Sequence, residues 1–216
     1  LQALAVGALP LAMAAVAQAI VVISGGIDLS IGSMMALTSV TAAILMKGQS
    51  ETFSIAVVIG VLVLGLVLGI INGTLVVITR VPDIVVTLAM SFVWAGAALV
   101  VLPSPGGGSA DWLTGMVKGP LGLDVIPRAL VVLLVIVGVI WIPLRRSNAG
   151  LALYAIGSNR LAAFRSGVAV GRTKVFAYML GGLFSPFGGL ALTATTGIGT
   201  PVPGAYTLLG VAAIVL

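Results

Sequence analysis

The sequence predicts an all-α integral membrane protein, a bundle of several spanning helices, on three observations. Apolar residues make up 60% of the 216 residues and charged residues 7%, whereas soluble domains average about half apolar and a quarter charged. The charges are also segregated, because residues 52–79, 84–110, 129–144 and 175–216 carry none. Such runs accommodate spans of roughly 20 residues. They must be helical, since every backbone donor and acceptor in hydrocarbon has to be satisfied within its own segment.

Apolar runs, helix breakers and charges then place about seven segments along the chain. We expect helices at 3–23, 31–46, 54–79, 84–102, 127–144, 175–193 and 207–216. Together they form one transmembrane domain over residues 1–216. The sequence starts without a methionine and stops inside an apolar run, so we interpret it as a piece of a longer chain, shortened at both ends.

The distribution of basic residues predicts which loops face the cytoplasm. Six of the ten Lys and Arg residues lie in the loop 145–174, with no acid among them, and the positive-inside rule makes this loop cytoplasmic. Counting back, residues 103–126 and 47–51 lie outside and the turn 80–83 lies inside. The outer loop is charge-balanced, with Asp111 and Asp124 against Lys118 and Arg128. Lys174 is expected to anchor the next helix at the inner surface.

Two local patterns refine these helices. At the inner turn, Pro82 suits a first helical turn, and Asp83 is expected to face the positive end of the following helix dipole, which gives a tight helical hairpin. In the segment 54–79, Gly65, Gly69 and Gly73 recur at four-residue spacing. This small-residue face lets another helix approach closely, and we interpret it as a packing surface in preference to a hinge.

The motif SGGIDLSIGS at 24–33 interrupts a long apolar stretch and contains a lone carboxylate, Asp28. A charge in this position is costly unless it is solvated or paired. Asp28 or Ser30 can cap the helix that begins at 31. Two interpretations stay open: a capped turn at the inner membrane surface, or a break within the membrane that lines the solute path.

Other polar groups lie inside apolar segments. The uncharged stretch 193–206 is either an outer turn or a second broken-helix element. Mid-span polar residues are candidates to line the path, although such residues more often form interhelical hydrogen bonds. Besides Asp28 and Ser30, the candidates are Asn72, Thr87, Ser91 and Trp94, with Gln18, Thr38 and Thr41 as further members of this group.

The loop 145–174 contains a short helix signal. Ser158 or Asn159 is a good N-cap, the next seven residues favour a helix, and Gly167 is a natural stop. Leu161 and Phe164 can share a face of this helix, so it could lie on the membrane or dock on a soluble partner.

Several ordered motifs resemble the permease subunits of ribose-type sugar importers of the ATP-binding cassette class, over the whole chain. The matching stretches are SGGIDLSIGS at 24–33, ING at 71–73, VP at 81–82, IVVTL at 84–88, YAIGSN at 154–159, AA at 162–163 and SGV at 166–168. The resemblance implies a type II-like importer permease with about ten spans in a full-length member, one N-terminal segment and roughly the last quarter being missing here.

The resemblance also implies the roles of residues and partners. The segment 150–168 corresponds to the coupling helix, which sits in a cleft of a separate ATPase subunit. The further partners implied are a second permease subunit, identical or different, a periplasmic solute-binding protein and the lipid of a bacterial inner membrane. Many relatives have an arginine directly after the paired alanines, where this chain has Phe164. The coupling residues are Gly157, Ser158, Asn159, Arg160, Ala162, Ala163, Phe164, Arg165, Ser166 and Gly167.

Composition argues against other classes of function. The chain has no Cys and no His, which removes the commonest nucleophile, general base and zinc ligands. The string GVAVGRTK at 167–174 has the wrong spacing for a phosphate-binding loop, so we expect ATP and Mg²⁺ on the partner and no cofactor on this chain. Nor do we expect nucleic-acid binding, since the basic residues flank spans. A stand-alone secondary transporter or channel stays an alternative, whereas an intramembrane enzyme lacks the groups it would need.

Overall fold

The computed structural model describes residues 1–122, 126–202 and 204–215, and the elements in this part of the chain are helices. Their bounds in chain order are α1 Gln2–Ile23, α2 Ile31–Met46, α3 Glu51–Thr79, α4 Asp83–Val101, α5 Asp111–Val117, α6 Arg128–Arg146, α7 Asn148–Ser158, α8 Arg160–Arg165, α9 Val170–Thr196 and α10 Tyr206–Val215. The predicted all-α class is therefore confirmed.

Membrane-spanning length separates the helices into two groups. Among the described residues, five helices (α1, α3, α4, α6 and α9) are long and apolar enough to cross a membrane, while α2 and α10 are apolar but shorter. All seven expected segments are present. The largest boundary error concerns α9, which begins at Val170 and ends at Thr196, one turn beyond the expected segment on either side.

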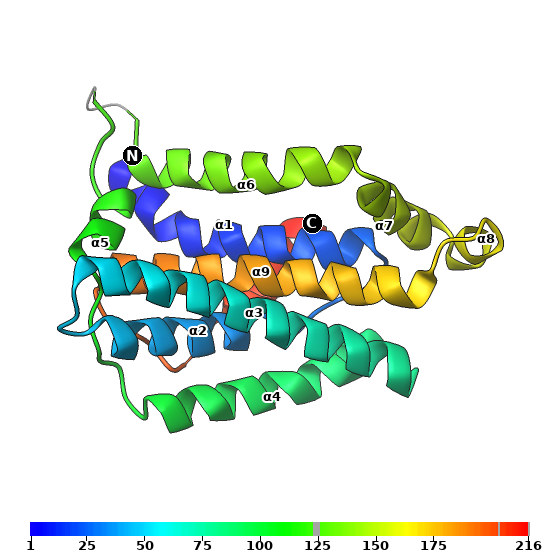
Figure 1. The fold of residues 1–216 in the computed structure, drawn as a ribbon, viewed down its shortest axis with the longest axis horizontal. Helices are drawn as coiled ribbons and strands as arrows, with labels where there is room; N and C mark the ends of the chain where they lie inside the picture. The colour runs from blue at the N-terminus through cyan, green and yellow to red at the C-terminus, as the bar shows by residue number, and fades with distance from the viewer. Residues whose placement is uncertain (123–125, 203, 216) are drawn as a thin grey trace.

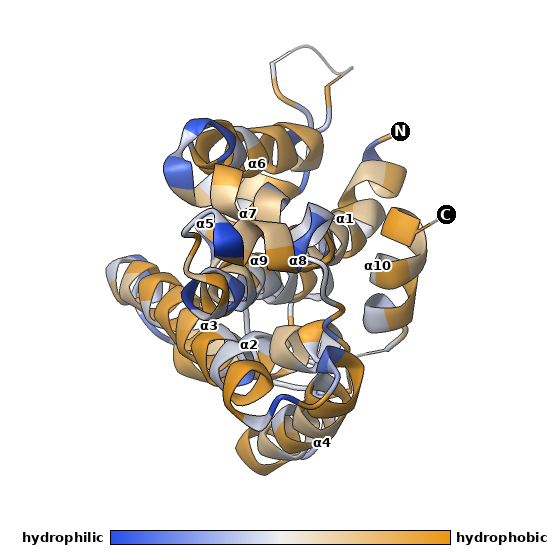
Figure 2. Cartoon of the chain, turned by 90° about the vertical axis from the view of Figure 1, so that its right-hand side faces the viewer, coloured by the Kyte–Doolittle hydropathy of each residue, from blue (hydrophilic) through white to orange (hydrophobic). Residues whose placement is uncertain are grey.

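The bundle has α9 at its centre. α9 packs against α1, α2 and α3, and these helices run roughly side by side, with α6 and α4 at opposite edges (Figure 1). Within an 18-residue apolar stretch of α9, 72% of the residues are buried inside the bundle, whereas the corresponding share is 11% in α4 and in α6. Viewed from the α8 end, α3 and the edge helix α4 are predominantly hydrophobic (Figure 2). Since lipid is as apolar as a protein core, this exposed surface fits a bilayer.

The glycine face on α3 packs against α9, as predicted. A Cβ on Gly65 would collide with Gly182 and Pro186, and one on Gly69 would collide with the backbone of Tyr178. At Gly73 a Cβ would come within 2.9 Å of the Tyr178 Cβ. The small residues therefore allow the two backbones to approach closely, which is the usual basis of helix association in lipid.

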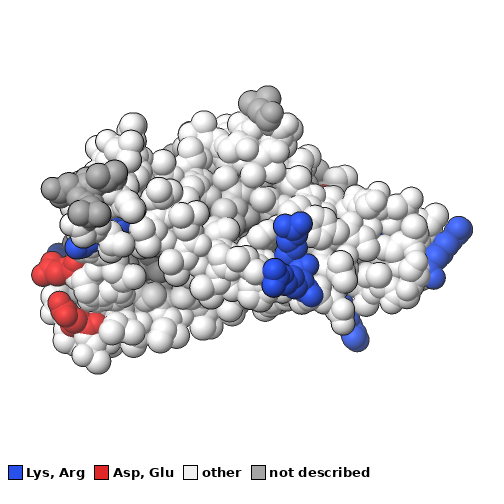
Figure 3. Space-filling view, turned by 90° about the horizontal axis from the view of Figure 1, so that it is seen from above, with Lys and Arg blue, Asp and Glu red and all other residues white. Residues whose placement is uncertain are grey.

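The loops segregate to two ends of the bundle, as the predicted topology requires. The loop between α4 and α5 returns to the end of α2, where the Gly108 N–H donates to the Ala43 carbonyl at 2.9 Å. The α3–α4 turn, α7 and α8 lie at the other end, which we call the basic end. On the face shown in Figure 3, the half that carries α7 and α8 displays Lys and Arg without acids, whereas the visible Asp and Glu gather at the opposite end, beside a smaller number of basic atoms.

Two short helices were not predicted from the residues alone, although the resemblance implied a coupling helix over 150–168, which the structure divides into α7 and α8 at Asn159. α5 lies in the expected outer loop, where Leu113 and Val117, one turn apart, are buried. α7 fills the part of the basic loop before the predicted short helix, and its Leu153 and Ile156 are buried. Both are too short to stand out as apolar runs and depend on tertiary packing for stability. Asp124, assigned to the charge-balanced outer loop, lies outside the described residues.

Candidate functional site

Residues 148–167, for which the resemblance implies a coupling role and which we call the coupling segment, contain α7 and α8, each capped at its start by a side chain. Ser147 Oγ accepts from the Gly150 N–H at 3.1 Å, and Asn159 Oδ1 accepts from the Ala162 N–H at 2.9 Å. α8 ends at Arg165, and Gly167 follows with φ +85°, a left-handed conformation that favours glycine. The predicted short helix, its Asn159 cap and its glycine stop are confirmed.

α8 projects beyond the bundle at the basic end (Figure 1). Its Leu161 and Phe164 are 58% and 67% exposed, while Ala163 on the other face is buried. Arg160 and Arg165 are also exposed. The helix thus presents an apolar surface with basic ends. Ser158, Ala162 and Ser166 are exposed in the same segment.

The C-terminal end of α7 contacts the segment that joins α1 to α2, residues 24–30, which we call the first break. A Cβ on Gly157 would collide with the Ile23 carbonyl and lie 3.4 Å from the Gly25 nitrogen. Gly25 itself has φ +73°. Only a glycine at 157 therefore allows α7 to lie this close to the end of α1, which links the coupling segment to the first break.

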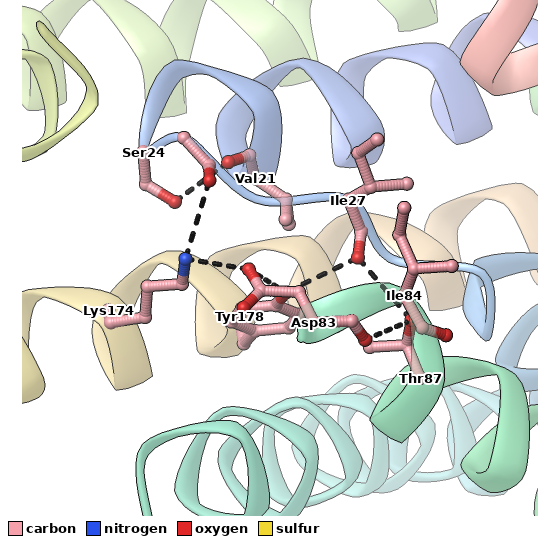
Figure 4. Close-up of polar contacts among 9 residues, drawn as sticks. Val21, Ser24, Ile27, Asp83, Ile84, Thr87, Lys174 and Tyr178 are labelled. Carbon is pink, nitrogen blue, oxygen red and sulfur yellow. Dashed lines mark hydrogen bonds and ion pairs between the residues drawn. The ribbon is translucent and has the colours of Figure 1, made fainter. Parts of the chain in front are cut away.

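A largely buried polar cluster contacts the first break from its other sides (Figure 4). The Lys174 ammonium on α9 lies 2.6 Å from Asp83 Oδ2 at the start of α4, and 3.5 Å from the Gly25 carbonyl. Tyr178 OH lies 2.9 Å from the same Asp83 oxygen and 3.3 Å from the Ile27 carbonyl oxygen. We call Asp83, Lys174 and Tyr178 the junction.

The junction corrects one prediction and extends another. Lys174 does not anchor its helix at a surface, because it is 6% exposed and a buried ammonium requires a partner. Asp83 does begin α4, in the first turn as expected, but its carboxylate also forms the ion pair. The sequence signal was present, since Asp83 is a lone acid between two long uncharged runs, yet nothing in the sequence identified its partner.

Asp28 lies fully buried within the first break and does not cap α2 in the predicted way. Its Oδ1 accepts from the Ser30 N–H at 2.8 Å and from Ser30 Oγ at 2.6 Å, so it closes a local turn just before the helix. Ser30 precedes α2 without a side-chain capping bond. A first-turn donor, the Gly32 N–H, instead binds Thr207 Oγ1 of α10 at 2.9 Å.

Four of the six path candidates form one chain of hydrogen bonds. From Asp28 it passes to Ser30 Oγ, which accepts from Asn72 Nδ2 at 2.6 Å, and Asn72 Oδ1 accepts from the Trp94 indole N–H at 3.2 Å. We call Asp28, Ser30, Asn72 and Trp94 the polar chain. It joins the first break to α3 and α4. Asp28, Ser30 and Asn72 are each 0% exposed, so in this conformation they face one another and not open water.

The remaining candidates make separate contacts. Thr87 Oγ1 on α4 accepts from the Leu29 N–H at 3.0 Å, which adds another tie between α4 and the first break. Ser91 and Thr41 each donate to a carbonyl of their own helix. Thr38 does the same, while Gln18 is buried with no hydrogen-bond partner among the described residues. These side chains do not form one site with the polar chain.

The second break, residues 197–205 between α9 and α10, lies at the opposite end of α9. Gly199 and Gly106 exchange two backbone hydrogen bonds, of 2.7 and 3.1 Å, and Gly199 packs against Ala43. The chain then returns to α10, whose Thr207 meets the start of α2. The second break therefore combines an outer turn with a return into the bundle, and residue 203 lies outside the described part.

Comparisons with known proteins identify the family of the chain. Residues 1–216 match the family described as the permease component of the branched-chain amino acid transport system. A probable ABC transporter permease of Sinorhizobium fredii is 36% identical, over 84% of this chain and 54% of its own length. A D-allose transport system permease of Escherichia coli is 31% identical over 85% and 56%. A ribose import permease of Haemophilus influenzae is 32% identical over 95% and 64%.

The chain thus spans between about half and two thirds of the length of these curated relatives. No solved structure matches it significantly. The match covers every described element, including the first break, the coupling segment and the spans around them. The chain is a multi-pass membrane protein and belongs to the family of branched-chain amino acid and ribose-type ABC transporter permeases.

Proposed function

We propose that the chain is part of the transmembrane subunit of an ATP-binding cassette importer, forming the translocation path for a sugar or sugar-like solute. Hydrolysis of ATP, with its Mg²⁺, takes place on a separate ATPase subunit, so this chain is not itself an enzyme. A second permease subunit and a periplasmic binding protein complete the transporter. The protein lies in a bacterial inner membrane, with the loop 145–174 in the cytoplasm.

The exposed apolar surface of α8 supports this proposal most directly. Leu161 and Phe164 lie on a six-residue helix that projects from the basic end. An apolar pair of this kind, flanked by Arg160 and Arg165, is suited to a groove on a soluble subunit. Contact between Gly157 and the first break gives such a subunit a mechanical connection to the spans. A stand-alone channel would have no use for this connection.

The polar chain is the proposed lining of the path. Its side chains are closed on one another in this conformation, so opening requires α4 or the first break to move. A small number of polar groups, of which Asp28 alone has an ionisable side chain, is suited to hydroxyl-rich solutes, which bind through hydrogen bonds. D-allose, ribose and autoinducer-2, named for relatives, are the first solutes to test.

The test is reconstitution of the full-length permease with the ATPase and binding protein encoded beside it, in proteoliposomes. We expect uptake of one such solute that requires ATP and the binding protein. Uptake driven by an ion gradient without ATP would overturn the proposal in favour of a secondary transporter.

A paired substitution then tests the role of α8. Leu161→Asp with Phe164→Asp should abolish co-purification of the ATPase, because two charges would enter an apolar contact. Leu121→Asp is the matched control, since Leu121 is 50% exposed but lies at the opposite end. Normal ATPase binding by the α8 variant would remove the docking assignment.

A further inference from the structure

The first break lies between the coupling segment and the spanning helices α4 and α9. Each of these elements contacts the break through residues of its own. Gly157 of α7 lies against Ile23 and Gly25. Lys174 and Tyr178 of α9 contact the Gly25 and Ile27 carbonyls, and Thr87 of α4 accepts from the Leu29 N–H. A displacement of α7 therefore reaches the first break before it reaches any residue of α4.

The junction joins the first break to the start of α4. Lys174–Asp83 is the one ion pair within the part of the chain that the structure describes, and its side chains are 8% and 18% exposed. Gly26 passes so close that a Cβ there would lie 2.5 Å from Asp83 Oδ2 and 3.1 Å from Tyr178 OH. The first break, α4 and α9 thus meet at one carboxylate.

Stability alone does not account for this ion pair. A buried pair loses much of its Coulomb attraction to desolvation, and apolar residues of similar size often stabilise a fold equally well. A charged pair instead constrains geometry, because its hydrogen bonds are directional. α4 is the helix for which such a constraint matters most, since only 11% of its 18-residue apolar stretch is buried within the bundle.

We propose that Asp83, Lys174 and Tyr178 are positioning residues for energy coupling, which make α4 follow the first break when the ATPase moves α7 and α8. The inference rests on the proposed function. As α7 shifts, Gly157 displaces the backbone at 23–25. Lys174 and Tyr178 keep this backbone in register with the Asp83 carboxylate, so the start of α4 moves with it. Trp94 of the polar chain lies on the same helix, and the displacement thereby reaches the path.

The decisive variant replaces both charges, Asp83→Leu with Lys174→Met, in the reconstituted transporter. No buried charge is left unpaired, so the protein should fold and bind its ATPase. ATP hydrolysis should continue, while solute uptake per ATP hydrolysed should fall about tenfold, which is within the range of coupling changes measured along such routes. Lys174→Arg keeps the charge and should retain coupling within about twofold of wild type.

A matched control removes a buried polar pair elsewhere on α9. Ser39 Oγ and Thr193 Oγ1 lie 2.8 Å apart and join α2 to α9, without contact to the junction. Ser39→Ala with Thr193→Val should leave uptake per ATP unchanged. A loss equal to that of the junction variant would mean that any polar tie on α9 matters, which contradicts a specific role for the junction.

Wild-type coupling by the Asp83→Leu, Lys174→Met variant would overturn the inference while leaving the proposed function intact. Absence of ATP-driven uptake by the wild type would instead reject the proposed function. If the double variant fails to fold, Tyr178→Phe replaces it. This change removes one hydroxyl and keeps the buried ring, and it should lower uptake per ATP about threefold. Unchanged coupling in Tyr178→Phe would then reject the inference.

Discussion

The two breaks in the bundle have similar sequences and different surroundings. Both are rich in glycine and both precede a short apolar helix. The first break lies against α7 and is held by an ion pair and side-chain hydrogen bonds from α4 and α9. The second break is held mainly by backbone contacts, through the paired hydrogen bonds between Gly199 and Gly106 of the α4–α5 loop. Similar composition thus provides one segment suited to transmit movement and one suited to fix a turn.

Crowding each break should separate the two roles most strongly. Gly157→Leu places a side chain against the Ile23 carbonyl, so α7 has to move away from the first break. We expect uptake per ATP to fall about tenfold or more in the reconstituted transporter, with the protein still folded, because Gly157 lies at an exposed surface.

Gly199→Leu is the corresponding change at the second break. A Cβ there would lie 2.8 Å from the Ala43 Cβ, and overpacking of this kind costs about 1–3 kcal/mol of stability. Thermal unfolding in detergent should therefore occur at a lower temperature, while the surviving protein couples normally. If Gly199→Leu uncouples transport as strongly as Gly157→Leu, the two breaks do not have the separate roles proposed for them.

Breaking the polar chain tests whether the first break depends on α3 and α4. Asn72→Ala removes the bonds to Ser30 and Trp94 and leaves the partly buried Trp94 indole N–H without its acceptor. We expect a loss of about 1–2 kcal/mol in the free energy of unfolding, measured by denaturant titration in detergent. Ser91→Ala is the control, since Ser91 bonds only its own helix. Equal stability of the two variants would show that the polar chain is not a structural tie.

The contact between α10 and α2 tests where the second break ends. Thr207→Val keeps the shape of the side chain but removes the acceptor of the Gly32 N–H. The unsatisfied donor should cost about 1 kcal/mol. Faster hydrogen exchange at Gly32, with the rest of α2 unchanged, is the expected signature. Protection as strong as in wild type would indicate another acceptor.

The smallest effect is expected for Asp28→Asn. The asparagine Oδ1 can accept the same two hydrogen bonds from Ser30, and the other carboxylate oxygen has no hydrogen-bond partner among the described residues. Folding and uptake should both stay within about twofold of wild type. Loss of uptake in a well-folded Asp28→Asn protein would show that the proposed path needs the carboxylate itself and not only its hydrogen bonds to Ser30.

Much of the fold was predictable, because the signals were local. Long uncharged apolar runs located the spans, the glycine spacing on α3 identified a packing face, and Asn159 with Gly167 delimited α8. The candidate site was only partly predictable. Asp28, Ser30, Asn72 and Trp94 were recognised individually as polar groups in apolar surroundings, but not as one hydrogen-bonded chain. α5 and α7 were missed because short helices depend on contacts from elsewhere.

The sequence by itself determined that this protein is a helical membrane protein with a broken first hairpin and a basic loop that contains a short helix, since hydrophobicity, capping and charge bias are properties of neighbouring residues. Only the tertiary structure decided which polar groups meet. Thr207 reaches Gly32 across 175 positions and Tyr178 reaches Asp83 across 95. Burial requires every such group to find a partner, but it does not specify which one. That choice depends on how the helices pack.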